Sequence, residues 1–505
     1  MKKLLSTILI ALIAASLTSC YESLDEANYT YAVATLNFYN TPEEANAAVM
    51  APLNYMRSSY EANWFATLEI NTEYGYPKGV YSNYTPRYEG LINATHVNRI
   101  ATNWDNLYRS ILYCNIAIDR LPEANAMTTE EINAYIGELR FLRALNYFNL
   151  VRNWGGVPLR TEENMETWDL AKSPVNEVYN LIIEDLKFAI GNVPAKPRLV
   201  GTPGVNACKS LLSEVYMYTE DYKEALGLSS EVIDSKEYSL VPVTSSRDFD
   251  KVFGYDLVTS SEEVFYIKTS RTDGKTWNYV SYTAHPKYEI EPGLRMLNGN
   301  GYYTHYTDLR NKVIENWDRN DLRYGLNIGF YVFGADAYGE YTCLFTKFWD
   351  PLAQGSGANV SIPLIRYPDV LITFAEASAR VNNNVPTEQS MEAINKLRRR
   401  AYGFNPEIAN AEIDYKLSDY NTMDKFIDLL IREETYERMN EAKHWNFTVR
   451  LGKAQELVGA YSNVNGDYTE IKEKHYLWKI PDAEFNYNKA MDQKRDQNPG
   501  YTTED

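Results

Sequence analysis

Paired helices are the feature that most constrains the fold of this chain. Apolar residues recur at helical spacing over 207–216 and again over 222–233, and the acidic pair Glu220-Asp221 lies between the two runs. Small side chains lie where the two helices would cross, which is typical of a tetratricopeptide (TPR) unit, whose period is about 34 residues. The same two-helix pattern returns at 369–381 with 388–400. The sequence therefore predicts a mainly α fold, a superhelix of TPR-like helical hairpins.

Further helices are predicted beside these pairs. Helical periodicity covers 104–121, 130–152, 175–190 and 424–441. The segment 130–152 carries two apolar stripes, one through Ile132, Ile136 and Leu139 and the other through Phe141, Leu145 and Phe148. A helix that is apolar on two faces packs between neighbours. We therefore expect 130–152 to lie inside the scaffold.

Two long segments do not fit the helical period. Residues 60–100 hold many tyrosines among Gly, Pro, Asn and Ser, and residues 240–360 mix short strand-like runs, such as 264–267, with Gly-rich and aromatic loops. With 505 residues, the chain exceeds one ordinary core of about 100–200 residues. We interpret it as one repeat scaffold that carries two large irregular insertions, where function tends to be located.

One predicted helix carries an acidic stripe. Phe426 and Leu430 lead along one helical face to three glutamates, Glu433, Glu437 and Glu441. These acids could form a binding site, or they could point inward and pair with arginines that hold helices together. The candidate partners are Arg366, Arg398 and Arg400. We favour the second interpretation, because unpaired buried acids are costly and these arginines lie in or beside neighbouring predicted helices.

The charge and the missing motifs exclude several classes of protein. The chain has 68 acidic and 50 basic side chains, a net charge of −18, whereas phosphate recognition in nucleic acids needs clustered Lys and Arg. Its five histidines form no metal-binding spacing, and neither GxSxG nor GxxxxGK[ST] occurs. We predict no nucleic-acid binding, no metal, no cofactor and no enzyme, although chance pairs among 68 acids leave a glycosidase open. Cys114, Cys208 and Cys343 allow one disulfide but do not require it.

The amino terminus has the pattern of a lipoprotein signal. Lys2 and Lys3 precede the apolar run 4–17, which has signal-peptide length and is too short to span a bilayer. The run ends in Leu-Thr-Ser-Cys at 17–20, which resembles a bacterial lipoprotein box with a lipidated cysteine. We predict a signal peptide at 1–19, lipidation of Cys20 and a tether over 20–40. An ordinary secretory signal that contains a cysteine is the alternative.

Four segments in order along the chain carry a family resemblance. They are RFLRALNYFNLVRNWGGVPL at 140–159; IRYPDVLITFAEA at 365–377 with INKLRRRAYG at 394–403; Glu433, Glu437, Glu441, Trp445 and Arg450 at a set spacing; and IPDAE at 480–484 with QNPGY at 497–501. With the lipoprotein signal, they resemble the SusD/RagB family of nutrient-binding outer-membrane lipoproteins of Bacteroidetes. Where the family often has Arg and Asp, this chain has His444 and Phe447. That departure puts local salt bridges in doubt, but not membership of the family.

The resemblance implies an architecture. It implies one SusD-like domain over 41–505, with a helical scaffold at about 41–60, 100–240 and 362–450 and a C-terminal tail at 451–505. The insertions at about 60–100 and 240–360 would form the ligand face.

The resemblance also implies a function and a partner. The lipoprotein would sit at the cell outer membrane, bind an oligosaccharide or polysaccharide, and deliver it to a SusC-like TonB-dependent transporter, over which it forms a hinged lid. Two alternatives stay open: a peptide-binding RagB-type uptake lipoprotein, and a TPR-like scaffold that only holds other proteins.

Aromatic side chains in the insertions are the candidate glycan-binding residues. A sugar ring presents CH groups on one face, against which an aromatic ring can stack, while hydroxyl groups on its rim take hydrogen bonds from polar side chains. The predicted stacking residues are Trp64, Tyr76, Tyr81, Tyr84, Trp277, Tyr302 and Tyr303. For each, packing in the core or a loop is the alternative. Trp104, Trp154 and Trp445 lie in helical or family-motif segments, and we assign them to the core.

Overall fold

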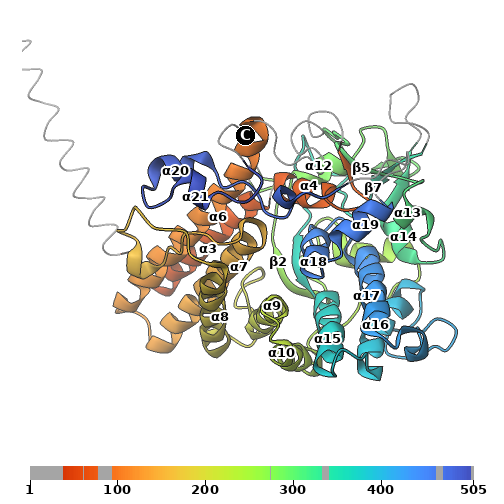
Figure 1. Cartoon of the computed structure of the whole chain (residues 1–505), viewed down its shortest axis with the longest axis horizontal. Coiled ribbons are helices and arrows are strands. Elements are labelled where there is room, and N and C mark those ends of the chain that lie inside the picture. The colour runs from red at the N-terminus through yellow and green to blue at the C-terminus, as the bar shows by residue number, and fades with distance from the viewer. Residues whose placement is uncertain are drawn as a thin grey trace, which may run out of the picture.

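Helical hairpins and a strand-containing irregular part make up the computed structural model of the chain (Figure 1). The structure describes residues 38–60, 62–77, 94–272, 275–331, 341–461 and 470–501. The predicted signal peptide, Cys20, Tyr81 and Tyr84 lie outside these residues. None of the described helices combines the length and the apolar character that a membrane crossing requires.

The N-terminal helices begin at well-defined caps. At the start of α3, the Thr41 hydroxyl accepts the N–H of Glu44 and the Glu44 carboxylate accepts the N–H of Thr41, and Thr128 and Glu131 form the same capping box before α7. The helices of this half are α3 (Pro42–Ser59), α4 (Ala62–Ile70), α6 (Ala94–Arg120), α7 (Thr129–Trp154), α8 (Val175–Asn192), α9 (Val205–Tyr218) and α10 (Tyr222–Asp234).

The predicted helical scaffold is confirmed. Helix α7 packs against α3, α6 and α8, and both of its apolar stripes are buried. Helices α9 and α10 form the predicted hairpin, and α10 packs on α15 (Tyr367–Val381), which pairs with α16 (Glu388–Ala401) and contacts α17 (Met423–Arg438). Figure 1 shows these helices following one another along the lower part of the molecule.

Short strands form most of the regular structure between α10 and α15. Strand β2 (Glu263–Ile267) pairs with β8 (Ile362–Arg366), which confirms the strand expected at 264–267. An antiparallel sheet has the order β1-β5-β7-β6, and β3 pairs with β4. The bounds are β1 (Tyr76–Pro77), β3 (Glu289–Glu291), β4 (Leu294–Arg295), β5 (His305–Asp308), β6 (Ile328–Phe330) and β7 (Thr342–Phe345), with helices α11 (Asp250–Phe253), α12 (Tyr279–Thr283), α13 (Lys312–Glu315) and α14 (Leu322–Asn327) between them.

The first insertion differs from its prediction. Instead of an irregular surface segment, it begins with helix α4, and every side chain from Trp64 to Ile70 is buried. Helix α4 contacts α6, α12 and α18 (His444–Arg450), so it is surrounded by other elements. The run WFATLEI is mostly apolar on all sides, which is the pattern of an enclosed helix. Its aromatic residues therefore belong to the core.

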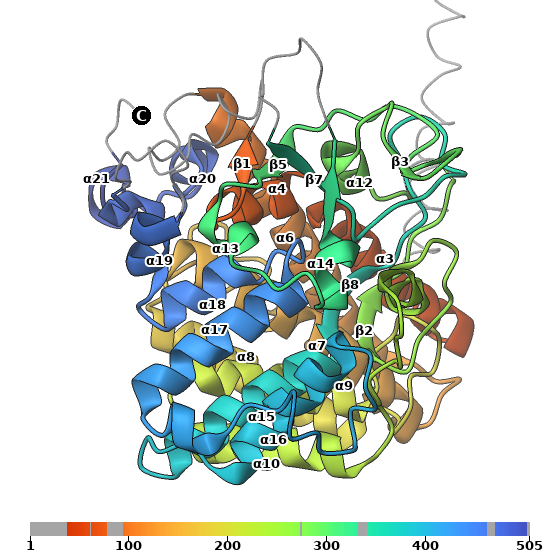
Figure 2. The same ribbon diagram turned by 90° about the vertical axis from the view of Figure 1, so that its right-hand side faces the viewer.

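The C-terminal tail returns to the scaffold. It comprises α19 (Ala454–Tyr461), α20 (Asp482–Tyr487) and α21 (Gln493–Asp496). Asn498 donates its side-chain N–H groups to the carbonyls of Trp154 (2.9 Å) and Trp478 (2.7 Å), and Trp154 donates to the carbonyl of Lys479 (3.1 Å). Figure 1 shows α20 and α21 beside α6 of the N-terminal half, whereas α19 packs on α18 (Figure 2).

Two larger buried clusters and one smaller cluster form the core. The largest joins the N-terminal helices to β2 and β8, and the next lies among α10, α15, α16 and α17. Trp104, Trp154 and Trp445 are buried, as predicted. The three cysteines are buried and free, so the chain does not use the disulfide that the sequence allowed.

Candidate ligand-binding surface

Two of the predicted stacking residues are core residues in the structure. Trp64 is 3 % exposed and packs edge-on against Tyr60 and Trp478. Trp277 is 1 % exposed, packs against Phe65, and donates its Nε1–H to the carbonyl of Tyr60 (3.0 Å). Neither ring offers a face to solvent, because helix α4 carries Trp64 inward and Trp277 packs among Phe65, Tyr279 and Phe348.

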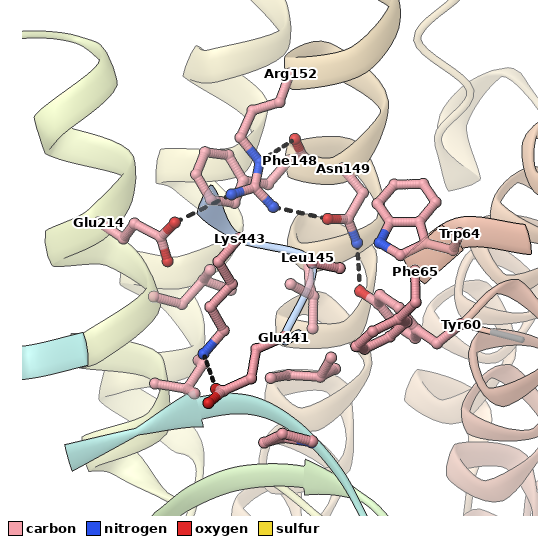
Figure 3. A pocket seen from close by; sticks show the side chains of 15 residues that line it. Tyr60, Trp64, Phe65, Leu145, Phe148, Asn149, Arg152, Glu214, Glu441 and Lys443 are labelled. Carbon is pink, nitrogen blue, oxygen red and sulfur yellow. Dashed lines mark hydrogen bonds and ion pairs between the residues drawn. The ribbon is translucent and has the colours of Figure 1, made fainter. Parts of the chain in front are cut away.

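Trp64 also lines a small polar pocket between α4, α7 and α9 (Figure 3). Arg152 pairs with Glu214 (3.0 Å) and donates to Asn149 (2.8 Å), which in turn donates to the Tyr60 hydroxyl. The pocket encloses about 40 Å³, which is room for water and far below the roughly 300–1,000 Å³ of small-molecule sites. We therefore do not place the ligand there.

The other candidates among the described residues are Tyr76, Tyr302 and Tyr303, and they belong to an aromatic cluster near α12, β1 and β5. Tyr302 is 45 % exposed and contacts Tyr282 edge-on, with 6.2 Å between ring centroids. The structure thus brings Tyr76, Tyr302 and Tyr303 to one part of the molecule, because β1 pairs with β5, which lies with α12 in the upper part of Figure 1. We define the aromatic cluster as Tyr76, Tyr282, His285, Tyr288, Tyr302, Tyr303, Tyr306 and Tyr331.

Ring contacts join His285, Tyr288, Tyr303 and Tyr331 within this aromatic cluster. The His285 ring lies between those of Tyr303 (4.5 Å) and Tyr331 (4.6 Å), and Tyr331 also meets Tyr288 edge-on (6.0 Å). Stacked and edge-to-face pairs at such distances fix the rings relative to one another. The cluster therefore holds its rings in set positions.

Strand pairing and a close backbone approach position the tyrosines. Tyr76 on β1 is paired with Tyr306 on β5, and their rings stack at 5.7 Å. The N–H of Tyr302 donates to the carbonyl of Ser281 at 2.7 Å, which docks the loop before β5 onto α12. Gly301 permits this approach, because a Cβ there would lie 2.6 Å from the carbonyl oxygen of Ala284.

Two local features turn side chains into the cluster. Tyr303 has a φ of 37°, a left-handed conformation that is uncommon for a residue other than glycine and that often occurs at functional sites. Gly329 on β6 leaves room for Tyr288, whose hydroxyl would lie 2.3 Å from a Cβ at that position. The local sequence is thus adapted to holding these rings.

Polar side chains lie beside the rings. Asn311 donates to the Tyr76 hydroxyl (2.8 Å) and to the carbonyl of Glu73 (2.8 Å). Arg310 pairs with Asp308 (2.7 Å), and its guanidinium lies 4.8 Å from the ring centroid of the exposed Tyr341. The surface therefore combines apolar ring faces with hydrogen-bonding groups.

A neutral histidine supports the cluster from behind. His305 is buried, and its Nδ1 lies 2.8 Å from the Tyr279 hydroxyl. Burial lowers the pKa of His305 to about 3, so the ring is uncharged at neutral pH.

Sequence reasoning missed Tyr282, His285, Tyr288, Tyr306 and Tyr331 as members of the cluster. A signal was present, because each lies in a short aromatic run of the second insertion: SYTAHPKY at 281–288, GYYTHY at 301–306 and GFYVF at 329–333. Which of these runs meet depends on the pairing of β5, β6 and β7, and the sequence does not determine that pairing.

The acidic stripe is a buried ionic network, as favoured above. Glu437 pairs with Arg366 (3.1 Å) and Arg400, and Glu441 pairs with Arg366 (2.8 Å) and Lys347 (2.8 Å). Burial alone would raise the pKa of Glu437. The attraction of the Arg400 and Arg366 charges outweighs burial and holds this pKa well below its usual range. The network is Glu262, Asp321, Arg323, Lys347, Arg366, Asp369, Arg400, Glu433, Glu434, Glu437, Arg438, Glu441, Lys443 and His444.

One arginine named as a partner lies elsewhere. Arg398 donates to the carbonyl of Ile413 and to the Tyr415 hydroxyl (2.5 Å) instead of to the stripe. Arg323, which the sequence analysis did not consider, takes its place and pairs with Glu433 (2.9 Å).

The departure at position 444 does not weaken the local salt bridges, contrary to the doubt raised above. His444 is buried between Glu434 and Glu73, and its Nε2 lies 3.0 Å from a Glu73 oxygen. Burial disfavours the charged ring, but the two carboxylates outweigh it and raise the pKa of His444 to about 10. The imidazolium supplies the cation, while Phe447 packs in the second core cluster.

Among the described residues, no group of three or more His, Cys, Asp or Glu side chains is arranged to hold a metal ion. The arrangement that the described surface offers is a set of fixed rings with polar neighbours.

Comparison with known proteins assigns this fold to a family. A family model described as "Starch-binding associating with outer membrane" matches residues 19–217, and the SusD family model matches 336–501. The helical scaffold of this chain, with its irregular, strand-containing part, is a SusD-like fold. The chain belongs to the SusD/RagB family.

Individual relatives agree with this assignment. SusD-like protein P38 of Formosa agariphila is 26% identical over 504 residues, covering 92% of this chain and 95% of that protein. A SusD homolog from Bacteroides thetaiotaomicron has a TM-score of 0.75 at 19% identity, covering 93% of this chain and 99% of that one. Surface glycan-binding protein A from Bacteroides fluxus has a TM-score of 0.71 at 18% identity, with coverages of 92% and 100%.

Proposed function

We propose that the chain binds an oligosaccharide or polysaccharide at the cell surface through the aromatic cluster. The single observation that carries the proposal is the exposed Tyr302 ring within a set of rings held by strand pairing and ring contacts. The family description names starch binding, and a relative of the same fold is described as a surface glycan-binding protein, both of which support a carbohydrate ligand.

The cluster suits a sugar for a physical reason. Tyr302 offers an apolar face for the CH side of a pyranose, and its hydroxyl tolerates water at the rim. The exposed Arg310 brings hydrogen-bond donors to this surface, while the buried Asn311 holds the Tyr76 hydroxyl in place. Rings that are already fixed lose little freedom when the ligand binds, so less binding energy is spent on ordering them. Tyr81 and Tyr84 remain candidates for the same surface.

Binding without chemistry, and delivery, complete the proposal. The chain would be anchored in the outer membrane through a lipid on Cys20 and would pass its glycan to a SusC-like TonB-dependent transporter. The family match and the lipoprotein box support this role.

Calorimetry on residues 21–505 with a panel of polysaccharides tests the proposal. We expect binding to at least one glycan, no release of shorter products, and about a tenfold or larger loss of affinity in Tyr302→Ala. Phe404→Ala is the matched control, because Phe404 is an aromatic residue of similar exposure (43 %) just beyond α16. Product release would instead indicate an enzyme, and binding of peptides without any glycan would indicate the RagB-type alternative.

A further inference from the structure

A second concave surface lies between helix α6, the segment 160–168 and helix α20. It encloses about 480 Å³, within the range of roughly 300–1,000 Å³ typical of small-molecule sites. Figures 1 and 2 show α20 apart from β5 and α12, so this groove is separate from the aromatic cluster. The proposed function does not use it.

Two aromatic rings on the groove stand almost entirely in water. Trp168 is 82 % exposed and Tyr487 is 83 % exposed, and both line the groove. Large apolar side chains left so exposed beside a cavity commonly mark a binding site. Leu112 on α6, also exposed, adds a third apolar side chain to the lining.

The backbone that carries Trp168 is held in place although its ring is free. The Arg160 guanidinium donates to the carbonyls of Thr167 (3.1 Å) and Trp168 (3.2 Å). On the other side, the Asn488 side chain accepts the N–H of Leu170 (3.0 Å) and donates to its carbonyl (2.7 Å). Interactions from Arg160 within the same loop and from the distant Asn488 thus fix the backbone that carries the ring, which lowers the cost of ordering it around a ligand.

Polar groups of both charges line the groove between the two rings. Glu484 accepts a hydrogen bond from Asn488 (2.8 Å) and lies 3.8 Å from Arg160, and Asp105 and Arg109 on α6 also line the groove. The centre of a protein–protein interface is depleted in Asp and Glu, whereas two acids, Asp105 and Glu484, line this groove. Because the two arginines balance these acids, the lining fits a neutral, hydroxyl-rich ligand better than a polyanion or an apolar protein surface.

We infer that this groove is a second oligosaccharide-binding site, in which Trp168 and Tyr487 stack on sugar rings while Arg160 and Glu484 bind hydroxyl groups. The inference rests on the proposed function, since it assigns the same class of ligand. Two sites on one chain hold a long polymer at two points, so the polymer gains avidity that a short oligosaccharide does not.

The test uses residues 21–505 with Trp168→Ala/Tyr487→Ala, Tyr302→Ala and the control Phe404→Ala. The probes are maltoheptaose with amylopectin and laminarihexaose with laminarin. We expect two short oligosaccharides bound per chain in the wild type and one in each site's variant. We also expect the double variant to lose about tenfold in affinity for the polymer.

The outcomes separate the two proposals. If the double variant binds every probe with wild-type stoichiometry and affinity while Tyr302→Ala binds more weakly, the second site is wrong and the proposed function stands. If Tyr302→Ala keeps full binding and the double variant loses it, the groove binds glycan and the assignment to the aromatic cluster is wrong. If the wild-type protein binds none of the four glycans, both the second site and the proposed glycan-binding function are wrong for these sugars.

Discussion

The second insertion contributes residues to both the buried ionic network and the aromatic cluster, but the side chains of the two regions differ in exposure. In the network, Arg366 and Glu441 are fully buried and are bonded to several partners. In the cluster, Tyr302 is almost half exposed and contacts Tyr282 edge-on. The comparison indicates that one region fastens the insertion to the scaffold and the other presents it to solvent.

The strand pair β2–β8 explains this division. Strand β8 leads directly into α15, where the scaffold resumes, and Glu263 on β2 is paired with Arg366 at the end of β8. At this point Arg366 binds Glu262 (3.1 Å), which also binds Arg400 on α16 (2.6 Å). The loops that carry the aromatic cluster can therefore expose their rings, because these buried ion pairs keep the insertion attached to the scaffold.

Removing the central cation of the network is expected to give the largest effect. Arg366→Met leaves Glu262, Glu437 and Glu441 with one cation fewer, and breaking a buried pair on one side costs about 3–5 kcal/mol. Urea denaturation at neutral pH measures the loss. Lys312→Met is the control, because its exposed pair with Glu315 contributes less than about 1 kcal/mol. Equal losses in the two variants would contradict a fastening role for the network.

The buried tryptophan that the sequence analysis placed in the ligand site is expected to follow closely. Trp277→Ala removes a fully buried ring and leaves the carbonyl of Tyr60 without its donor, at a cost of about 3–5 kcal/mol in the free energy of unfolding. Tyr302→Ala is expected to change that free energy by less than about 1 kcal/mol. A stable Trp277→Ala protein that no longer binds glycan would assign Trp277 to the ligand after all.

A pH dependence of intermediate size follows from Glu69 at the edge of the network. Burial raises the pKa of Glu69 from 4.5 to about 7, even though it accepts hydrogen bonds from the N–H of Ala442 and the Tyr74 hydroxyl. Between pH 4.5 and 7 the folded state holds a proton that the unfolded state has lost, so the stability from this group falls as pH rises. The expected fall is on the order of 3 kcal/mol.

Denaturation of the wild type and of Glu69→Gln at several pH values measures this effect. The variant keeps a neutral side chain at all pH values, so the difference between the two proteins should change across pH 4.5–7 and be constant above it. His444 contributes in both proteins, with stability present below pH 6.5 and lost as pH rises through about 10. A difference that does not vary with pH would show that Glu69 is charged in the fold.

The sequence predicted the scaffold better than the ligand surface for a physical reason. Helical periodicity is local, so the hairpin of α9 and α10 and the two-faced helix α7 followed from spacing alone. The pairing of acids with arginines followed from the cost of burying charge. The ligand surface depends on which loops meet, and aromatic composition cannot distinguish Trp64, which a buried helix carries inward, from Tyr302, which a loop leaves exposed.

The smallest expected effect comes from Gly329, which leaves room for the Tyr288 ring in the aromatic cluster. Gly329→Ala places a methyl group 2.3 Å from the Tyr288 hydroxyl and 2.4 Å from Cγ2 of Thr346, so the Tyr288 ring must move. Such overpacking costs about 1–2 kcal/mol in stability, and because Tyr288 contacts Tyr331 we expect glycan affinity to fall by about two- to fivefold.

Gly227→Ala on α10 is the matched control, since a Cβ there meets nothing within 4 Å. That control should gain up to about 1 kcal/mol in stability, because alanine is the better helix former, and should keep full affinity. Full glycan affinity in a folded Gly329→Ala protein would mean that the ligand contacts Tyr302 without relying on the ring positions behind it.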